Sequence, residues 1–387
     1  MKRILIVIFY VFLITAVIVG CNNNQSQVKQ NQQQKQEKEV LQESQENKVE
    51  ENKNTSSKTS SKTSSKNTSR NNNDDTDNDK KANFIYSPFT GKQIPEMSLN
   101  RVIMASIENT SSSRPQNGLN QAPIVYELLV EGGITRFLTI YWNKIPDKIG
   151  PIRSLRPYMI NIAKNYNALL LHAGASPQGF KMLNDIDIAH LDQIYKGNYY
   201  WRSSNRNSPH NLYTKPKIND YLNNLTGQKY NSRFNFQQVS LVSSNREAEE
   251  IKIDYWGQYQ VLYQYDVKDN NYKRFINNFS TPHLTTDKKQ IAVDNIIVQF
   301  VSTRVKDDIG RLKMDLEGKG KALIFNNGNV VKGSWKSQKN TWTYYLNDND
   351  DRVELNPGQT WIQIVPFSTD VKYSSQNGSN KTSDKNE

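Results

Sequence analysis

The sequence predicts an α+β fold: a mixed α/β domain over residues 84–235, followed by a mainly antiparallel β domain over 236–373. Apolar runs alternate with segments of helical period in the first part, whereas the second part alternates apolar and polar residues with period two. All six Trp lie within 84–373, which is long enough to form two domains of ordinary size.

In the first domain, short apolar runs predict strands at 102–107, 136–142 and 168–172. Prolines mark the starts of the expected helices, since proline is favoured in the first helical turn. These helices begin at Pro157, at Pro177 and at Pro216.

The second domain shows the strand pattern repeatedly, with turn residues between the runs. The expected strands are 251–255, 259–265, 296–301, 321–325, 330–335, 341–346 and 359–366. The sequence Asn326-Asn-Gly-Asn329 between two of them predicts a tight hairpin.

The amino terminus has the pattern of a lipoprotein signal peptide over residues 1–20. Lys2 and Arg3 precede an apolar run, and Ile18-Val-Gly20 stands before Cys21 as in a bacterial lipobox. The pattern predicts a diacylglyceryl group on Cys21 and a location on the extracellular side of the cell membrane, because two acyl chains give stable anchoring. The alternative is an uncleaved transmembrane helix with an incidental cysteine.

Residues 21–83 are rich in Gln, Asn, Ser, Thr and Lys and contain no aromatic residue, which predicts a disordered tether behind the lipid anchor. The tail 374–387 is expected to be disordered as well. A second interpretation of the tether is that its Lys-Thr-Ser-Ser repeats bind an anionic wall polymer.

Composition narrows the classes of function. One cysteine and four scattered histidines give no basis for a disulfide framework or a metal site, and no cofactor is expected. The net charge of +12 suits anionic wall polymers or lipid headgroups. Nucleic acid would accept the same charge, but the signal peptide argues against such a partner.

Several polar blocks resemble the YerB-like lipoproteins of Gram-positive bacteria, a two-domain family of unknown function. The blocks cover nearly all of 84–368 and lie at 107–109, 114–119, 126–137, 150–157, 172–177, 209–214, 295–300, 318–321 and 355–362. The resemblance implies lipid anchoring and a surface location. It implies no reaction and no catalytic residues.

The first domain places arginines beside glycines and prolines, a pattern that suits recognition of carboxylate or phosphate. Two interpretations remain open: an anion-binding site, or a structural network in which the arginines pair with glutamates such as Glu108, Glu127 and Glu131. The candidate ligand-binding residues are Arg114, Arg136, Arg153, Arg156, His172, His210 and Asn211, with Arg202 and Arg206 in the same loops.

The leading hypothesis is a non-enzymatic binding or assembly factor of the envelope that recognises an anionic wall component or a partner protein. The alternative is a cell-wall-modifying enzyme in which His172 or His210 acts as a general base beside Glu127 or Glu131. A third possibility is an adaptor that binds through its β domain, where aromatic residues form either a core or a glycan-stacking platform. Those residues are Trp335, Trp342, Tyr344, Tyr345 and Trp361.

Overall fold

The computed structural model describes residues 84–375 and the backbone of 381–384, apart from 99, 216, 238–245, 256–258 and 340. The signal peptide, Cys21 and the tether lie outside the described residues. The described part belongs to one compact unit. None of its helices is both long and apolar enough to cross a membrane.

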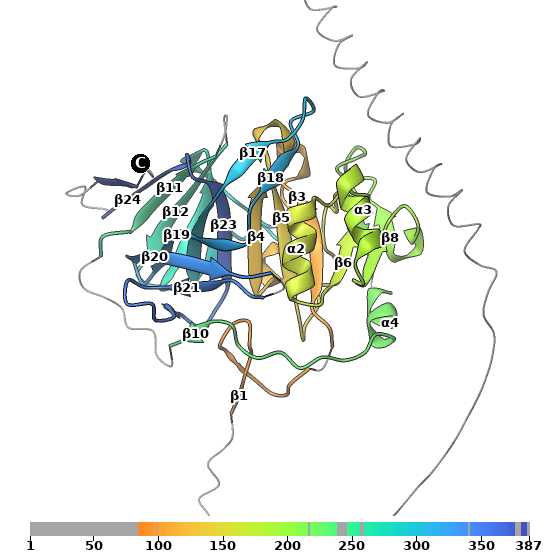
Figure 1. Cartoon of the computed structure of the whole chain (residues 1–387), viewed down its shortest axis with the longest axis horizontal. Helices are drawn as coiled ribbons and strands as arrows, with labels where there is room; N and C mark the ends of the chain where they lie inside the picture. Colours follow the sequence, from red (N-terminus) through yellow and green to blue (C-terminus); the bar gives the residue numbers. More distant parts are fainter. Residues whose placement is uncertain are drawn as a thin grey trace, which may run out of the picture. The chain divides into compact units, whose positions relative to one another are not determined.

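A ten-stranded mixed sheet runs through both halves of the described chain (Figure 1). Its strands, in spatial order, are β21 (Tyr344–Leu346), β20 (Asn329–Ser337), β19 (Gly318–Asn326), β16 (Asn295–Val301), β23 (Thr360–Pro366), β4 (Ile124–Leu129), β5 (Thr135–Tyr141), β3 (Ile103–Glu108), β6 (Leu169–His172) and β7 (His190–Asp192). The junction is the parallel pair β23–β4, in which Ile362 lies opposite Tyr126. The first and second parts of the sequence therefore share one sheet.

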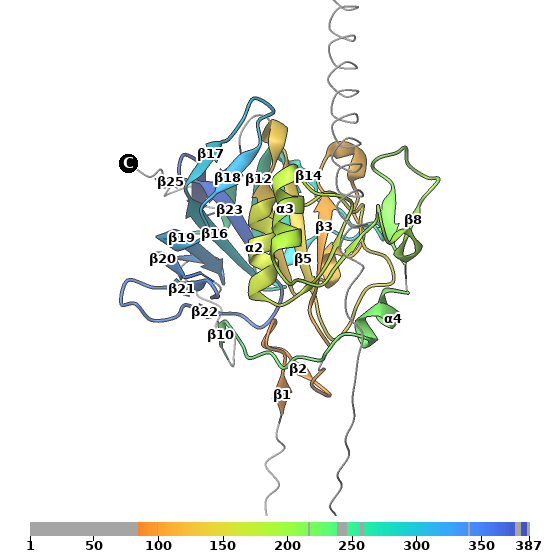
Figure 2. The same ribbon diagram turned by 45° about the vertical axis from the view of Figure 1, so that its right-hand side comes forward.

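A second, antiparallel sheet is built from the later part of the chain. Its order is β14 (Asn278–Pro282), β13 (Asn271–Ile276), β12 (Gln260–Asp266), β11 (Glu250–Asp254), β24 (Asp370–Ser374) and β25 (Lys381–Asp384), and β15 (Ala292–Val293) pairs with β13. Figure 2 shows β12 and β14 behind the ten-stranded sheet, with α2 (Pro157–Asn165) and α3 (Pro177–Asp185) in front of it.

The remaining elements are short. Four two-stranded ribbons pair β1 (Ile85–Tyr86) with β2 (Gln93–Ile94), β8 (Tyr200–Arg202) with β9 (Leu212–Thr214), β10 (Asn235–Phe236) with β22 (Glu354–Leu355), and β17 (Thr303–Val305) with β18 (Leu312–Met314). The third helix is α4 (Ile218–Asn223), and single 3₁₀ turns lie at Ser111–Ser113, Leu119–Gln121, Glu131–Gly133 and Gly197–Tyr199.

Successive side chains of the central strands point to opposite faces of the sheet, so each packs against a different layer of the protein. Tyr126 faces the layer that contains α2, since its hydroxyl lies 2.8 Å from that of Tyr166 at the helix end. Its neighbour Glu127 faces the second sheet, where it meets Arg274. The central strands are thus buried on both faces.

The α+β prediction is confirmed, and most strands of the second part are antiparallel as expected. Two differences have clear causes. Strand β4 is not predicted by period-two alternation, because both of its faces are buried. Strand β25 lies in the tail that was expected to be disordered. Its backbone pairs with β24, because an edge strand presents unpaired N–H and C=O groups to which a further segment can hydrogen-bond.

Candidate functional site at the carboxyl edge of the sheet

The candidate site lies where three parallel strands of the large sheet end. β3, β4 and β6 run in the same direction, so the residues that follow them gather at one edge. The segment 152–155 enters between the ends of β3 and β6: the Arg153 amide donates to the Ser106 carbonyl, and the Arg153 carbonyl accepts from Ala173. Segment 150–157, which contains Arg153 and Arg156, is therefore held by backbone bonds.

Arg156 and Glu131 form a bidentate pair at this edge. The Nε and Nη2 atoms of Arg156 lie 2.6 and 2.7 Å from the two carboxylate oxygens of Glu131. Arg156 is also the residue that precedes α2, and its Nη1 donates to the Ser154 hydroxyl at 3.0 Å. The pair lowers the pKa of Glu131 against the effect of its burial, so Glu131 is held as a carboxylate.

Arg136 lies beside this pair without a carboxylate of its own. It is only 7% exposed, and its Nη1 donates to the carbonyl and the hydroxyl of Ser154. Among the described residues it forms no ion pair. Burial and the nearby guanidinium groups of Arg156 and Arg153 lower its pKa to about 9. Its charge at neutral pH is therefore only partly compensated.

Arg153 and His210 share a different carboxylate, that of Glu108. The Arg153 Nη2 lies 3.1 Å and the His210 Nδ1 lies 2.9 Å from Glu108 Oε1, which also accepts from the Thr110 hydroxyl at 3.0 Å. Glu108 is buried, whereas the side chains of Arg153 and His210 are 29% and 26% exposed. The pair that the geometry brings together is thus His210 with Glu108.

The loop that presents His210 is braced from within. Asn211 accepts from Arg202 at 2.9 Å and donates to the carbonyls of Ser203 and Arg206. The guanidinium of Arg206 donates to the Ser113 and Pro115 carbonyls, which ties the loop to the segment after β3. Asn211, one of the candidate ligand-binding residues, therefore stabilises the loop that contains His210.

Glu127 belongs to a fully buried network between the two sheets. Its Oε2 accepts from Arg274 Nη2 at 2.9 Å, and both side chains are inaccessible to solvent. Its Oε1 accepts from Thr135 at 2.7 Å and from Tyr259 at 2.9 Å. Arg114 joins the network through Asn109, to which its Nε donates at 3.0 Å. Glu127 lies in the interior and Arg114 is partly exposed, and neither forms a hydrogen bond with Arg136, Arg153 or Arg156 in the described part of the chain.

Arg274 was not singled out from the sequence, although its side chain is fully buried. Its other nitrogens donate to His283 Nδ1 at 2.9 Å and to the Tyr263 hydroxyl at 2.6 Å. Arg274 follows the strand pattern of β13 in an inward-facing position, where a charge is unexpected. In the sequence, the sign that Arg274 has a special role is an arginine at an inward-facing position of an alternating strand.

His172 is also interior. Its Nδ1 lies 3.0 Å from the Gly174 carbonyl, to which it donates, so its Nε2 accepts from His190 Nδ1 at 3.1 Å. Neither Glu127 nor Glu131 is among its hydrogen-bond partners in the described part of the chain. Burial lowers the pKa of His172 to about 4. Both ring nitrogens are engaged, and the ring is sealed from solvent.

The aromatic residues of the second half divide into two groups. Trp335 and Trp361 are buried in the core, and Tyr345 is nearly so. Trp342 is partly exposed and lies 4.6 Å from Tyr166, ring centre to ring centre. The two buried tryptophans therefore fill the protein interior.

The chain matches two family models. Residues 89–231 match the protein of unknown function (DUF3048) N-terminal domain, and residues 251–362 match its C-terminal domain. A Bacillus subtilis (strain 168) protein named "Putative lipoprotein YerB" is 33% identical over 299 residues, which cover 74% of this chain and 87% of that protein. The crystal structure of YerB from Bacillus subtilis is similar with a TM-score of 0.66 and 30% identity, over 74% of this chain and 99% of that one. The chain therefore belongs to the YerB-like, two-domain DUF3048 family.

Proposed function

We propose that the protein is a lipid-anchored binding protein of the Gram-positive cell surface that holds an anionic group at the carboxyl edge of its large sheet. The lipobox before Cys21 and the name of the Bacillus relative both support the anchor. The wall of such a cell offers phosphate and carboxylate polymers as ligands.

The observation that carries the proposal is that Arg136 forms no ion pair of its own among the described residues, so that its charge is only partly compensated. Three guanidinium groups, those of Arg136, Arg153 and Arg156, gather here against the carboxylates of Glu108 and Glu131. The cluster lies at the start of α2, whose first turn has no side-chain cap and whose positive end favours an anion. A bound phosphate or carboxylate would supply the missing negative charge.

We expect the chain from residue 22 onward, which lacks the signal peptide and the lipidated cysteine, to be retained on isolated cell walls at low salt and released at high salt. Exposed charge pairs are screened by salt, whereas apolar contacts are not. Arg136→Gln combined with Arg153→Gln should weaken retention about tenfold or more, because each lost charged hydrogen bond is worth about 1.5–3 kcal/mol.

Lys181→Gln is the matched control, since Lys181 is 77% exposed on α3 and its ion pair within the described part of the chain is with Asp185. Walls with and without teichoic acid identify the polymer. Retention that is equal for the double variant and the Lys181→Gln variant would rule out the arginine cluster as the binding site.

A second candidate function, a hydrolytic activity on the wall, rests on the His210–Glu108 pair. Glu108 fixes His210 through Nδ1, and the Nε2 of a partly exposed ring is free among the described residues to take a proton from water. Arg153 beside it would stabilise developing negative charge. His210 would be the base and Glu108 a positioning residue.

For this candidate, purified protein should release soluble fragments from wall preparations, and His210→Gln should reduce the rate about 100-fold or more, as for loss of a general base. Glu108→Gln should reduce the rate less and alter its pH profile, because it removes only the orienting carboxylate. Equal rates for the wild type and His210→Gln would exclude the dyad.

A further inference from the structure

A buried hydroxyl, a carboxamide and a carboxylate meet at the end of the β3–β5 strand pair. Asn109 directly follows β3, and Thr135 precedes Arg136, which lies opposite Glu108 in the register of the two strands. The Asn109 Nδ2 lies 2.7 Å from the Thr135 Oγ1, and both residues are only 2% exposed. Side chains that face each other on antiparallel strands can be joined by a short covalent link, because their Cβ atoms lie about 4.5–5.5 Å apart.

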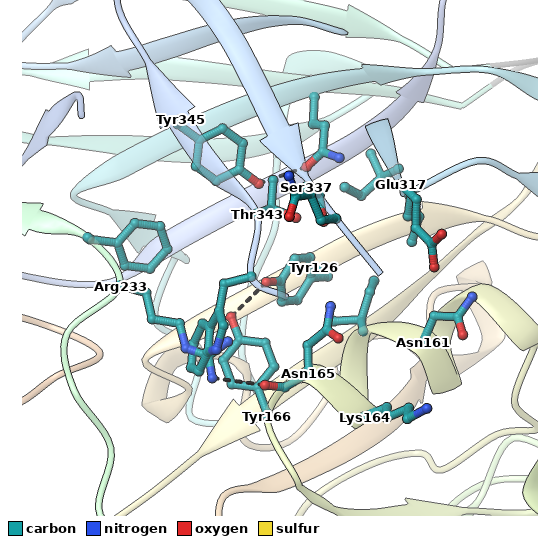
Figure 3. Close-up of a pocket in the computed structure, with 17 residues that line it drawn as sticks. Tyr126, Asn161, Lys164, Asn165, Tyr166, Arg233, Glu317, Ser337, Thr343 and Tyr345 are labelled. Carbon is teal, nitrogen blue, oxygen red and sulfur yellow. Dashed lines mark hydrogen bonds between the residues drawn. The ribbon is translucent and has the colours of Figure 1, made fainter. Parts of the chain in front are cut away.

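The carboxylate of Glu127 contacts both the hydroxyl and the amide nitrogen. Its Oε1 accepts from the Thr135 hydroxyl at 2.7 Å and lies 3.3 Å from the Asn109 Nδ2. Glu127 points to the second sheet, on the opposite face of β4 from Tyr126 and the small pocket that Tyr126 lines (Figure 3). Oε1 is therefore placed to take the proton of the hydroxyl and to give it to the amide nitrogen, as a general acid–base catalyst does.

The oxygen of the same carboxamide accepts from two further donors. Asn109 Oδ1 lies 3.0 Å from the Arg114 Nε and 3.2 Å from the Gln116 Nε2. Such donors stabilise the negative charge that develops on a carbonyl oxygen when a nucleophile adds to its carbon, and a charged guanidinium does so more strongly than an amide. The cluster thus contains the parts of an acyl-transfer site: a nucleophile, a base, a carbonyl and oxyanion donors.

We propose that this cluster forms an ester bond between the side chains of Thr135 and Asn109 in the folded chain. The Thr135 Oγ1 adds to the amide carbon Cγ of Asn109 while Glu127 takes the hydroxyl proton. The Cγ–Nδ2 bond then breaks, and Glu127 gives the proton to the leaving nitrogen. One ester replaces one carboxamide, ammonia is released, and no co-reactant is needed.

The fold favours this reaction and protects its product. Cγ is bonded to Nδ2, so a small rotation of the Asn109 amide turns the carbon toward the hydroxyl, at the approach distance of about 3–3.5 Å that acyl transfer requires. The strands hold the reacting groups together, and the reaction has to occur only once in each chain. The Tyr259 hydroxyl lies 2.7 Å from the Asn109 Nδ2 on the side of the second sheet, and exclusion of water slows hydrolysis of the ester.

The ester fastens two strand ends beside the candidate site. Asn109 begins the segment that leads to Arg114, and Thr135 is the neighbour of Arg136 in the arginine cluster. The bond closes residues 109–135 into a ring, which keeps the end of β3 joined to the start of β5. Formation of the ester does not depend on anion binding at the arginine cluster.

The test is the intact mass of the purified chain from residue 22 onward after prolonged incubation. We expect a mass about 17 Da below that of the sequence, because one ammonia is lost. Thr135→Val should have its full mass, whereas Thr135→Ser should keep the deficit because it retains a hydroxyl. Thr139→Val is the matched control and should also keep the deficit, since Thr139 is buried on β5 but donates to the Ala105 carbonyl.

A digest of the wild-type chain locates the bond even if Thr135→Val fails to fold. Trypsin and a glutamate-specific protease cut after Glu108, Glu127, Glu131 and Arg136, so peptides 109–127 and 132–136 separate unless the ester joins them. We expect a joined pair that mild alkali splits, with a carboxylate left at position 109. A wild-type chain of full mass, a deficit that persists in Thr135→Val, or separate peptides alone before alkali treatment would overturn the proposal.

Discussion

Glu127→Gln is expected to lower the free energy of unfolding by about 3–5 kcal/mol. The substitution keeps the shape of the side chain but leaves the buried guanidinium of Arg274 without its carboxylate. An amide nitrogen would also face donors, because Glu127 accepts from Thr135, Tyr259 and Arg274. Denaturant titration followed by tryptophan fluorescence measures the change.

Glu131→Gln is the matched control for this prediction. It also removes a carboxylate from a bidentate arginine pair, but Glu131 and Arg156 are partly exposed, so we expect a loss of about 1 kcal/mol or less. Arg274→Met in the Glu127→Gln background should restore part of the stability, because the unpaired charge is then gone. Equal losses for Glu127→Gln and Glu131→Gln would contradict the buried network as described.

The same network explains why the sequence could not predict the position of Glu127. Its partner is 147 residues away, on a strand of the other half, and the pairing depends on how the two sheets face each other. The sequence offered Glu108, Glu127 and Glu131 as equivalent acidic residues of the first domain. Strand alternation separates them, since Glu127 points to the second sheet whereas Glu131 lies in the turn after β4.

Local patterns predicted several elements well. The prolines mark the starts of α2 and α3, and the apolar runs match β3, β5 and β6 to within one residue. The parallel pair β16–β23 and its extension to β4 had no local signal, because strand neighbours depend on contacts between distant segments. The shared sheet is therefore a property of the folded chain that periodicity does not encode.

The partners of the arginines at the candidate site could not be predicted from the sequence either. The sequence showed that arginines are frequent in loops that contain glycine and proline. In the structure, each of these arginines has a different partner. Arg156 pairs with Glu131, Arg153 with Glu108, and Arg114 with Asn109. Arg136 has Ser154 as its hydrogen-bond partner among the residues that the structure describes. The three-dimensional arrangement decides which arginine has a positive charge without a carboxylate partner.

Acidification should destabilise the protein through His172. The unfolded chain takes up a proton at this side chain below about pH 6.5. Burial keeps the imidazole neutral in the folded protein until about pH 4. The unfolded state thus binds more protons between these values, and the free energy of unfolding falls as the pH decreases. The shift corresponds to a loss of about 2–3 kcal/mol between pH 7.5 and 4.5. His283 acts in the same direction, since burial and Arg274 lower its pKa as well.

His172→Asn isolates this contribution. The variant loses the hydrogen bond to Gly174 and is less stable at neutral pH, but its unfolding free energy should fall less steeply toward pH 4.5 than that of the wild type. Denaturant titrations at several pH values give the two slopes, and Lys181→Gln should keep the wild-type slope. An unchanged pH dependence in His172→Asn would mean that the imidazole titrates in the folded protein as it does in water. That result would be incompatible with a ring whose two nitrogens are engaged by Gly174 and His190 in the protein interior.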